Sequence, residues 1–103
     1  MTIQAQYQDN TIYVQLNGEI DEYNAASARW EADKIAEHYA TRSQRAVFDL
    51  QGVSFMDSTG IGFLIGRYKK FRRFGVPVYV INPSSATDRI LTMSGIYTLM
   101  PKL

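Results

Sequence analysis

The fold of this chain is decided by one stretch, Met56-Asp57-Ser58-Thr59-Gly60-Ile61-Gly62. It lies where an apolar run, predicted to be a buried strand, gives way to an amphipathic pattern that predicts a helix. Ser58 would begin this helix, and a hydroxyl there can cap it by accepting a bond from a free N–H of the first turn. The hydroxyl can also accept a phosphate, because those N–H groups and the helix dipole favour an anion. The residue types alone favour capping.

The helix after this stretch is predicted over residues 58–74. Its apolar residues recur with helical spacing and predict a buried stripe at Ile61, Leu64/Ile65, Tyr68 and Phe71. Gly62 and Gly66 are interpreted as positions of close backbone approach, and Gly75 as a left-handed cap. The last two turns carry four cations, Lys69, Lys70, Arg72 and Arg73. We interpret this cluster as a solvated helix end that suits the negative end of the dipole, rather than a phosphate site.

Upstream, residues 2–7 and 11–17 alternate polar and apolar side chains around a turn at Asp9-Asn10, which predicts a hairpin. A helix is predicted over residues 22–39, with Asp21 as its N-cap. Two stripes compete on this helix. The one we favour as buried contains Ala25, Ala28, Ala32, Ile35/Ala36 and Tyr39. The alternative contains Tyr23, Ala26 and Trp30, so our choice leaves Trp30 at an edge or partly exposed.

Three more strands and one more helix complete the predicted elements. The central strand is expected at residues 46–50, a further strand at 76–81, a short helix at 86–93 and a last strand at 96–100. The order is β-β-α-β-α-β-α-β, which predicts an α/β fold with a mixed, mostly parallel sheet of 4–5 strands. At 103 residues the chain is expected to be a single domain, residues 1–103.

Composition narrows the function classes. The formal net charge is +1, which gives no global field toward nucleic acid or an anionic membrane, so neither is expected as a partner. There is no cysteine, which excludes disulfides and thiolate chemistry. No apolar run approaches the length of a membrane span, and the N-terminus lacks the pattern of a signal peptide. We therefore expect a cytoplasmic protein.

Catalytic and metal sites are not expected. A nucleophilic serine needs a base within hydrogen-bond reach, and the single histidine, His38, lies near the end of a predicted helix. The acids that could gather are Asp21, Glu22, Asp49 and Asp57, and they show no recognised ligand spacing. We interpret them as solvated loop acids, and expect no metal, no cofactor and no enzymatic activity.

Several motifs together resemble the STAS domain of anti-sigma factor antagonists. They are Asp49-Leu50, Val53–Gly62, Gly66–Lys69, Gly18–Asp21 and Met93–Ile96. The resemblance spans nearly the whole chain and keeps the order of elements. It is strongest toward the branch that controls sigma factor F in sporulation, with the branch that controls sigma factor B in general stress second.

The resemblance implies a switch in transcription regulation. In this family the unmodified domain binds an anti-sigma factor that is a GHKL-type serine kinase, which releases the sigma factor. That kinase phosphorylates the serine matching Ser58, and a PP2C-type phosphatase removes the phosphate. The partner contacts implied by the resemblance are Asp21, Tyr23, Asn24, Asp57, Thr59, Gly60 and Ile61.

The sequence departs from the family pattern in two ways, and the same region is compatible with two alternative functions. The family usually continues into a C-terminal helix, whereas this sequence stops at Leu103, so that helix is expected to be absent. Thr59 offers a second hydroxyl beside Ser58. The same region could instead serve as the docking surface of a non-phosphorylated STAS adaptor in a transport or sensory complex. It could also be the anion site of a module that binds a nucleotide or another small ligand.

Overall fold

The computed structural model describes residues 1–103 and contains one four-stranded sheet in the order β1-β2-β3-β4. The first pair of strands is antiparallel and the next two pairs are parallel. This confirms the α/β fold with a mixed, mostly parallel sheet. The strands are β1 (Thr2–Gln8), β2 (Thr11–Asn17), β3 (Arg45–Gly52) and β4 (Val78–Ile81). The helices are α1 (Ala25–Tyr39), α2 (Ser58–Arg72) and α3 (Ser85–Ser94), with 3-10 turns η1 (Ala40–Arg42) and η2 (Ile96–Thr98).

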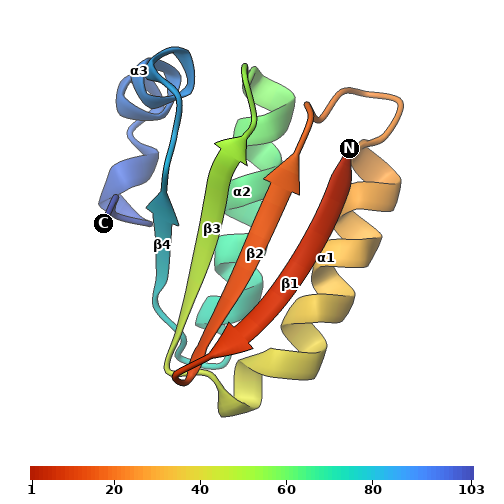
Figure 1. Ribbon diagram of the computed structural model, residues 1–103, viewed down its shortest axis with the longest axis vertical. Coiled ribbons are helices and arrows are strands. Elements are labelled where there is room, and N and C mark those ends of the chain that lie inside the picture. Colours follow the sequence, from red (N-terminus) through yellow and green to blue (C-terminus); the bar gives the residue numbers. More distant parts are fainter.

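Helices α1 and α2 cover one face of the sheet, and α3 lies beyond the carboxyl end of β4 (Figure 1). The loops that follow β2, β3 and β4 all lie at the upper end of the molecule in that view, which we call the site end. The opposite end, where β1 meets β2, we call the hairpin end. Asp9 and Asn10 form the predicted turn there, both with positive φ, as a two-residue hairpin turn requires.

The core lies between the sheet and the two helices. Alternate residues of the central strands face it, including Val14 of β2 and Phe48 of β3. Of the stripe predicted for α1, Ala28, Ala32 and Ala36 are buried, while Trp30 of the alternative stripe is 67% exposed. The other members of the predicted stripe, Ala25, Ile35 and Tyr39, are half-buried. Small residues let α1 pack closely on the strands. None of the helices combines the length and the apolar character needed to span a bilayer.

Helix α1 begins at Ala25, three residues later than predicted, and its N-cap is Asn24 rather than Asp21. Residues 22–24 form a turn instead. The carboxylate of Asp21 accepts hydrogen bonds from the backbone N–H groups of Tyr23 and Asn24, both at 2.9 Å. Asp21 therefore caps the turn that leads into the helix, a local competition with helix that is typical of aspartate.

The buried face of α2 differs from the predicted stripe. Gly60, Phe63, Leu64, Arg67 and Phe71 are buried, whereas three residues predicted to be buried lie half-buried beside them, namely Ile61, Ile65 and Tyr68. The face is rotated because Arg67 lies inward, where its Nε is 2.8 Å from a carboxylate oxygen of Asp33 on α1. A charged residue at a core position is tolerated when it is paired in this way.

Close backbone approach occurs at a different glycine from those predicted. A Cβ at Gly62 or Gly66 would meet nothing within 4 Å, so neither allows a tight contact. A Cβ at Gly60 would lie 2.5 Å from the Met56 side chain. Gly60 therefore lets the buried Met56 fold under the first turn of α2 and fixes the junction between β3 and the helix.

The predicted last strand over residues 96–100 is wrong. Ile96–Thr98 forms the 3-10 turn η2, and the amides of Leu99 and Met100 both donate to the carbonyl of Ile96. Ile96 and Met100, four residues apart, are buried, which is a helical rather than an alternating spacing. A single strand-like bridge forms later, where Lys102 pairs in parallel with Val80 of β4.

Candidate functional site

The junction between β3 and α2 presents Ser58 with its hydroxyl free. Asp57 is the N-cap of α2, and its carboxylate accepts bonds from the amides of Thr59 at 2.9 Å and Gly60 at 3.3 Å. The interpretation of Ser58 as the cap is therefore wrong. Ser58 is the first helical residue, it is exposed, and its Oγ makes no hydrogen bond within the chain. The local reason is that Asp57 has the extended backbone conformation that a cap requires, one residue earlier than expected.

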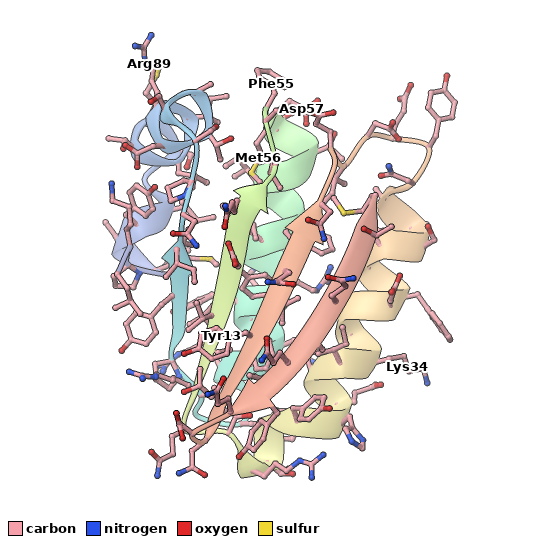
Figure 2. The ribbon with its side chains drawn as sticks, in the orientation of Figure 1. Tyr13, Lys34, Phe55, Met56, Asp57 and Arg89 are labelled. Carbon is pink, nitrogen blue, oxygen red and sulfur yellow. The ribbon has the colours of Figure 1, made fainter.

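Met56 and Phe55 hold this junction in different ways. Met56 is only 4% exposed and packs beneath Gly60, whereas Phe55 is 53% exposed. Figure 2 shows Phe55 and Asp57 near the top of the site end, with Met56 below them. The junction thus combines a rigid inner anchor with an exposed aromatic ring close to Ser58 in sequence.

The loop between β2 and α1 joins the site end through hydrogen bonds. The Ser54 hydroxyl donates to the Glu19 carboxylate, which ties this loop to the one before α2. Asp21 and Asn24 are engaged with each other, since the Asp21 amide donates to the Asn24 side chain at 2.9 Å. Tyr23 is 88% exposed and has no side-chain hydrogen bond. Of the three predicted contacts in this loop, Tyr23 is available to a partner, while the other two shape the loop.

An apolar groove lies between α2 and α3 and borders Ser58 directly. Its volume is about 470 Å³. We call this the α2–α3 groove, and it is lined by Phe55, Met56, Asp57, Ser58, Ile61, Ile90, Met93 and Ser94. Met93 is 80% exposed, although it is a large apolar side chain. The sequence prediction missed Phe55, Ile90 and Met93 as site residues, although Phe55 and Met93 stood inside the motifs that carried the resemblance.

A second hollow borders Ser58 on its other side, between α1 and α2. Its volume is about 280 Å³. We call this the α1–α2 hollow, and it is lined by Ala25, Arg29, Ser58, Thr59, Gly62 and Phe63. Arg29 was not predicted, because nothing in the sequence indicates that its position on α1 faces the start of α2. The predicted contacts Thr59 and Ile61 thus lie on opposite sides of Ser58, with Gly60 buried between them.

The remaining candidate residues lie far from Ser58 or are already hydrogen-bonded within the chain. Asp49 accepts bonds from the Gln51 amide and from the Asn82 side chain. No group of three or more His, Cys, Asp or Glu side chains gathers into a possible metal site. His38 contacts Arg42 at the hairpin end, with 2.7 Å between the two side-chain nitrogens. The basic cluster lies at the C-terminal end of α2, about 20 Å of helix away from Ser58.

The site is thus an exposed serine at the start of a helix in a small α/β domain, bordered by an apolar groove. The sequence model of the STAS domain matches residues 2–103. The chain therefore belongs to the STAS domain family, as its motifs predicted.

Two relatives of this chain are both named antagonists of anti-sigma factors. The anti-sigma F factor antagonist of Paenibacillus polymyxa is 29% identical over 101 residues, which cover 98% of this chain and 85% of the relative. The anti-sigma-B factor antagonist of Staphylococcus aureus is 27% identical over 101 residues, which cover 97% of this chain and 90% of the relative.

Solved structures of the anti-sigma factor antagonist SpoIIAA share the fold. Its unphosphorylated form superposes with a TM-score of 0.78 at 21% identity, covering 99% of this chain and 88% of that one. Its phosphorylated form superposes with a TM-score of 0.70 at 21% identity, covering 99% and 91%. At these identities the likeness shows the fold of this chain.

Proposed function

We propose that this chain is an anti-sigma factor antagonist in a partner-switching module. Its unphosphorylated form binds an anti-sigma factor that is also a serine kinase, and so frees the sigma factor. Phosphorylation of Ser58 ends that binding, and a phosphatase of the PP2C type restores it. The proposal draws on the relatives, which are named antagonists of anti-sigma F and anti-sigma-B factors.

The single observation that carries the proposal is the free Ser58 hydroxyl. Because Asp57 takes the cap, Ser58 has no structural task that modification would disturb. Its exposure gives a kinase access to the oxygen. In the proposed reaction Ser58 Oγ forms a bond to the γ-phosphorus of ATP, ADP leaves, and the hydroxyl proton passes to a base on the kinase. SpoIIAA, which shares this fold, has been solved in both forms.

The docking surface is the α2–α3 groove together with Tyr23. Exposed Tyr23, Phe55 and Met93 provide aromatic and flexible apolar side chains, which are enriched at protein interfaces. Ser58 borders the groove, so a partner seated there necessarily covers it. Asp57, Thr59, Gly60 and Ile61 contribute through the shape of the helix start rather than through long side chains.

The proposed switch depends on the negative charge that phosphorylation of Ser58 places at the edge of the α2–α3 groove. A phosphate adds about −1.5 to −2 charge at neutral pH. Burying it against a partner, beside the Asp57 carboxylate, requires the desolvation of a charged group. A coupling of about 1–3 kcal/mol would weaken binding roughly 5- to 150-fold. The domain itself stays folded, because Ser58 lies at the surface and makes no contact that the phosphate breaks.

The first test is the intact mass of the full chain after incubation with its cognate anti-sigma kinase and ATP. We expect one added phosphate on the wild type and on Thr59→Ala, and none on Ser58→Ala. Phosphate on Ser58→Ala would move the site to Thr59. No phosphate on any variant, with binding retained, would favour the adaptor role without phosphorylation.

The second test is affinity for the same partner by titration calorimetry. We expect Ser58→Ala to bind as tightly as the wild type and Ser58→Asp to bind at least about 5-fold more weakly. Equal affinity of Ser58→Asp and the wild type would contradict the charge mechanism. Whether the partner belongs to the sigma F or the sigma B system is answered by presenting both anti-sigma factors.

A further inference from the structure

The α1–α2 hollow places an arginine and the proposed phosphate acceptor on facing walls. Ala25 and Arg29 lie one helical turn apart on α1, and Ser58 and Gly62 lie one turn apart on α2. Both pairs line the same hollow of about 280 Å³. The hollow is open beside Gly62, since a Cβ there would meet no atom within 4 Å. The missing side chain leaves room for a group larger than a hydroxyl on Ser58.

Arg29 has no acidic partner. The nearest candidate by spacing is Asp33, four residues further along α1, but Asp33 pairs with Arg67 at 2.8 Å. No hydrogen bond or ion pair involves the Arg29 guanidinium. Between the two helices, Asp33 pairs with Arg67 and Glu37 pairs with Lys70, so the positive charge of Arg29 is left without a counter-charge.

The charge imbalance also affects Arg67. Burial is the main cause that lowers the pKa of Arg67, Asp33 raises it, and the nearby positive charge of Arg29 lowers it further. Arg29 is thus near enough to Arg67 for repulsion between the two cations. An anion bound by Arg29 would relieve this repulsion.

We propose that Arg29 binds the phosphate on Ser58 within the same chain, which deepens the proposed function and rests on it. The amides of Thr59 and Gly60, which would otherwise attract the phosphate, are already bound to Asp57. Arg29 is the single basic side chain among the residues of the two hollows that border Ser58. A guanidinium can bind two phosphate oxygens at once, which suits it to this role better than a lysine.

Two consequences follow from this clamp. The phosphate is drawn toward the α1–α2 hollow and its charge is partly compensated, so the modified chain keeps its fold despite the adjacent Asp57. The dianionic form of the phosphate is also favoured, since an opposite charge at short range lowers the pKa of an acid. Both effects are internal to this chain and need no partner.

The test measures the second ionisation of the phosphate by ³¹P NMR titration of the full chain. Phosphoserine is introduced at position 58 during translation, so no kinase is needed. We expect the second pKa to lie below the usual value of about 6 by roughly half a unit or more. Arg29→Gln should return it to about 6, and Arg29→Lys should restore only part of the shift.

Arg89→Gln is the matched control. Arg89 is exposed on α3 at the site end and lines neither hollow, yet its loss changes the net charge equally (Figure 2). We expect the phosphate pKa of this variant to equal that of the wild type. Equal effects of Arg29→Gln and Arg89→Gln, or a phosphate pKa near 6 in the wild type, would overturn the clamp.

Folding and function are checked separately. Arg29 is exposed, so Arg29→Gln should leave the amide spectrum and unfolding midpoint of the unphosphorylated chain nearly unchanged. Because the phosphate is installed without a kinase, absence of a clamp would leave the partner switch standing. Conversely, a clamp in a chain that no anti-sigma kinase phosphorylates would count against the proposed function alone.

Discussion

The two ends of the sheet differ in what their surface side chains contact. At the site end Tyr23, Phe55 and Met93 are 88, 53 and 80% exposed. At the hairpin end the rings of Tyr7 and Tyr39 stack with centroids 5.5 Å apart. The Tyr7 hydroxyl donates to the backbone carbonyl of Arg42 at 2.7 Å, and the Arg42 guanidinium lies over both rings.

This difference indicates that the side chains at the hairpin end stabilise the fold, whereas those at the site end are free to bind a partner. Aromatic groups at the hairpin end are already satisfied within the chain, so their contacts stabilise the fold. Comparable groups at the site end have no partner in the chain, and large exposed apolar side chains gathered around a groove mark an interaction surface. Substitutions at the two ends should therefore change different measured quantities.

The largest expected effect is on stability at the hairpin end. Tyr39→Ala removes the stack on Tyr7, the contact with His38 and the cation contact with Arg42. We expect the free energy of unfolding in urea to fall by about 2–3 kcal/mol, less than for a fully buried aromatic residue. Affinity for the anti-sigma factor, measured where the variant is folded, should stay within twofold. A loss of affinity without a loss of stability would show that Tyr39 serves binding rather than the stability of the fold.

The next prediction tests the packing of Met56 beneath Gly60 at the start of α2. Gly60→Ala places a methyl group 2.5 Å from the Met56 side chain, which must then shift. We expect a loss of about 2 kcal/mol in urea unfolding, typical of overpacking. Gly62→Ala is the matched control, since its Cβ meets open space, and it should be neutral or stabilising by up to about 1 kcal/mol. Equal losses in the two variants would show that helix geometry, rather than Met56, is responsible.

How far the sequence predicts these regions depends on the range of the interactions. The hairpin turn at Asp9 and the alanine stripe of α1 follow from local chemistry and helical periodicity, and both were predicted correctly. The position of Ser58 at the start of a helix was predicted for the same reason. The capping role was assigned to the wrong residue because either Asp57 or Ser58 could take the extended conformation.

Features that depend on distant contacts were missed. Burial of Arg67 requires Asp33, which lies 34 residues earlier and on another helix. The α2–α3 groove requires Met93 to approach the start of α2, and no local pattern specifies that packing. The short apolar run from Ile96 fits either a strand or a helical turn, so its length could not decide between them.

A smaller effect is expected on binding at the site end. Met93→Ser removes an exposed apolar side chain from the α2–α3 groove without exposing the core. We expect affinity for the anti-sigma factor to fall about tenfold, or about 1.4 kcal/mol, by titration calorimetry. The free energy of unfolding should change by less than about 0.5 kcal/mol. Trp30→Ser removes a larger exposed apolar side chain from α1, away from the groove, and should leave affinity unchanged if the groove is the docking surface.

The smallest effect concerns the C-terminal segment, residues 101–103. Like the side chains of the hairpin end, it makes its polar contacts within the chain. The carboxylate of Asp88 accepts bonds from the Tyr97 hydroxyl at 2.6 Å and from the Lys102 ammonium at 2.9 Å. These bonds, Tyr97 first, lower the pKa of Asp88 below its ordinary value of 3.8. A lowered pKa in the folded state means that the contribution to stability is present above pH 3.8 and is lost as the pH falls through the folded value.

The Leu103 amide reports this loss, because it donates to the carbonyl of Val80 at 3.0 Å and so holds the segment against β4. On acidification we expect its NMR shift to move toward the value of a free chain below pH 3.8, while the sheet amides stay unchanged. In Asp88→Ala the shift should be near the free-chain value at every pH, with no acid transition. Glu31→Ala, which removes an exposed acid from α1, should behave as the wild type. An unchanged acid transition in Asp88→Ala would mean that another carboxylate holds the segment, and that its pairing with Tyr97 and Lys102 does not fasten it to the sheet.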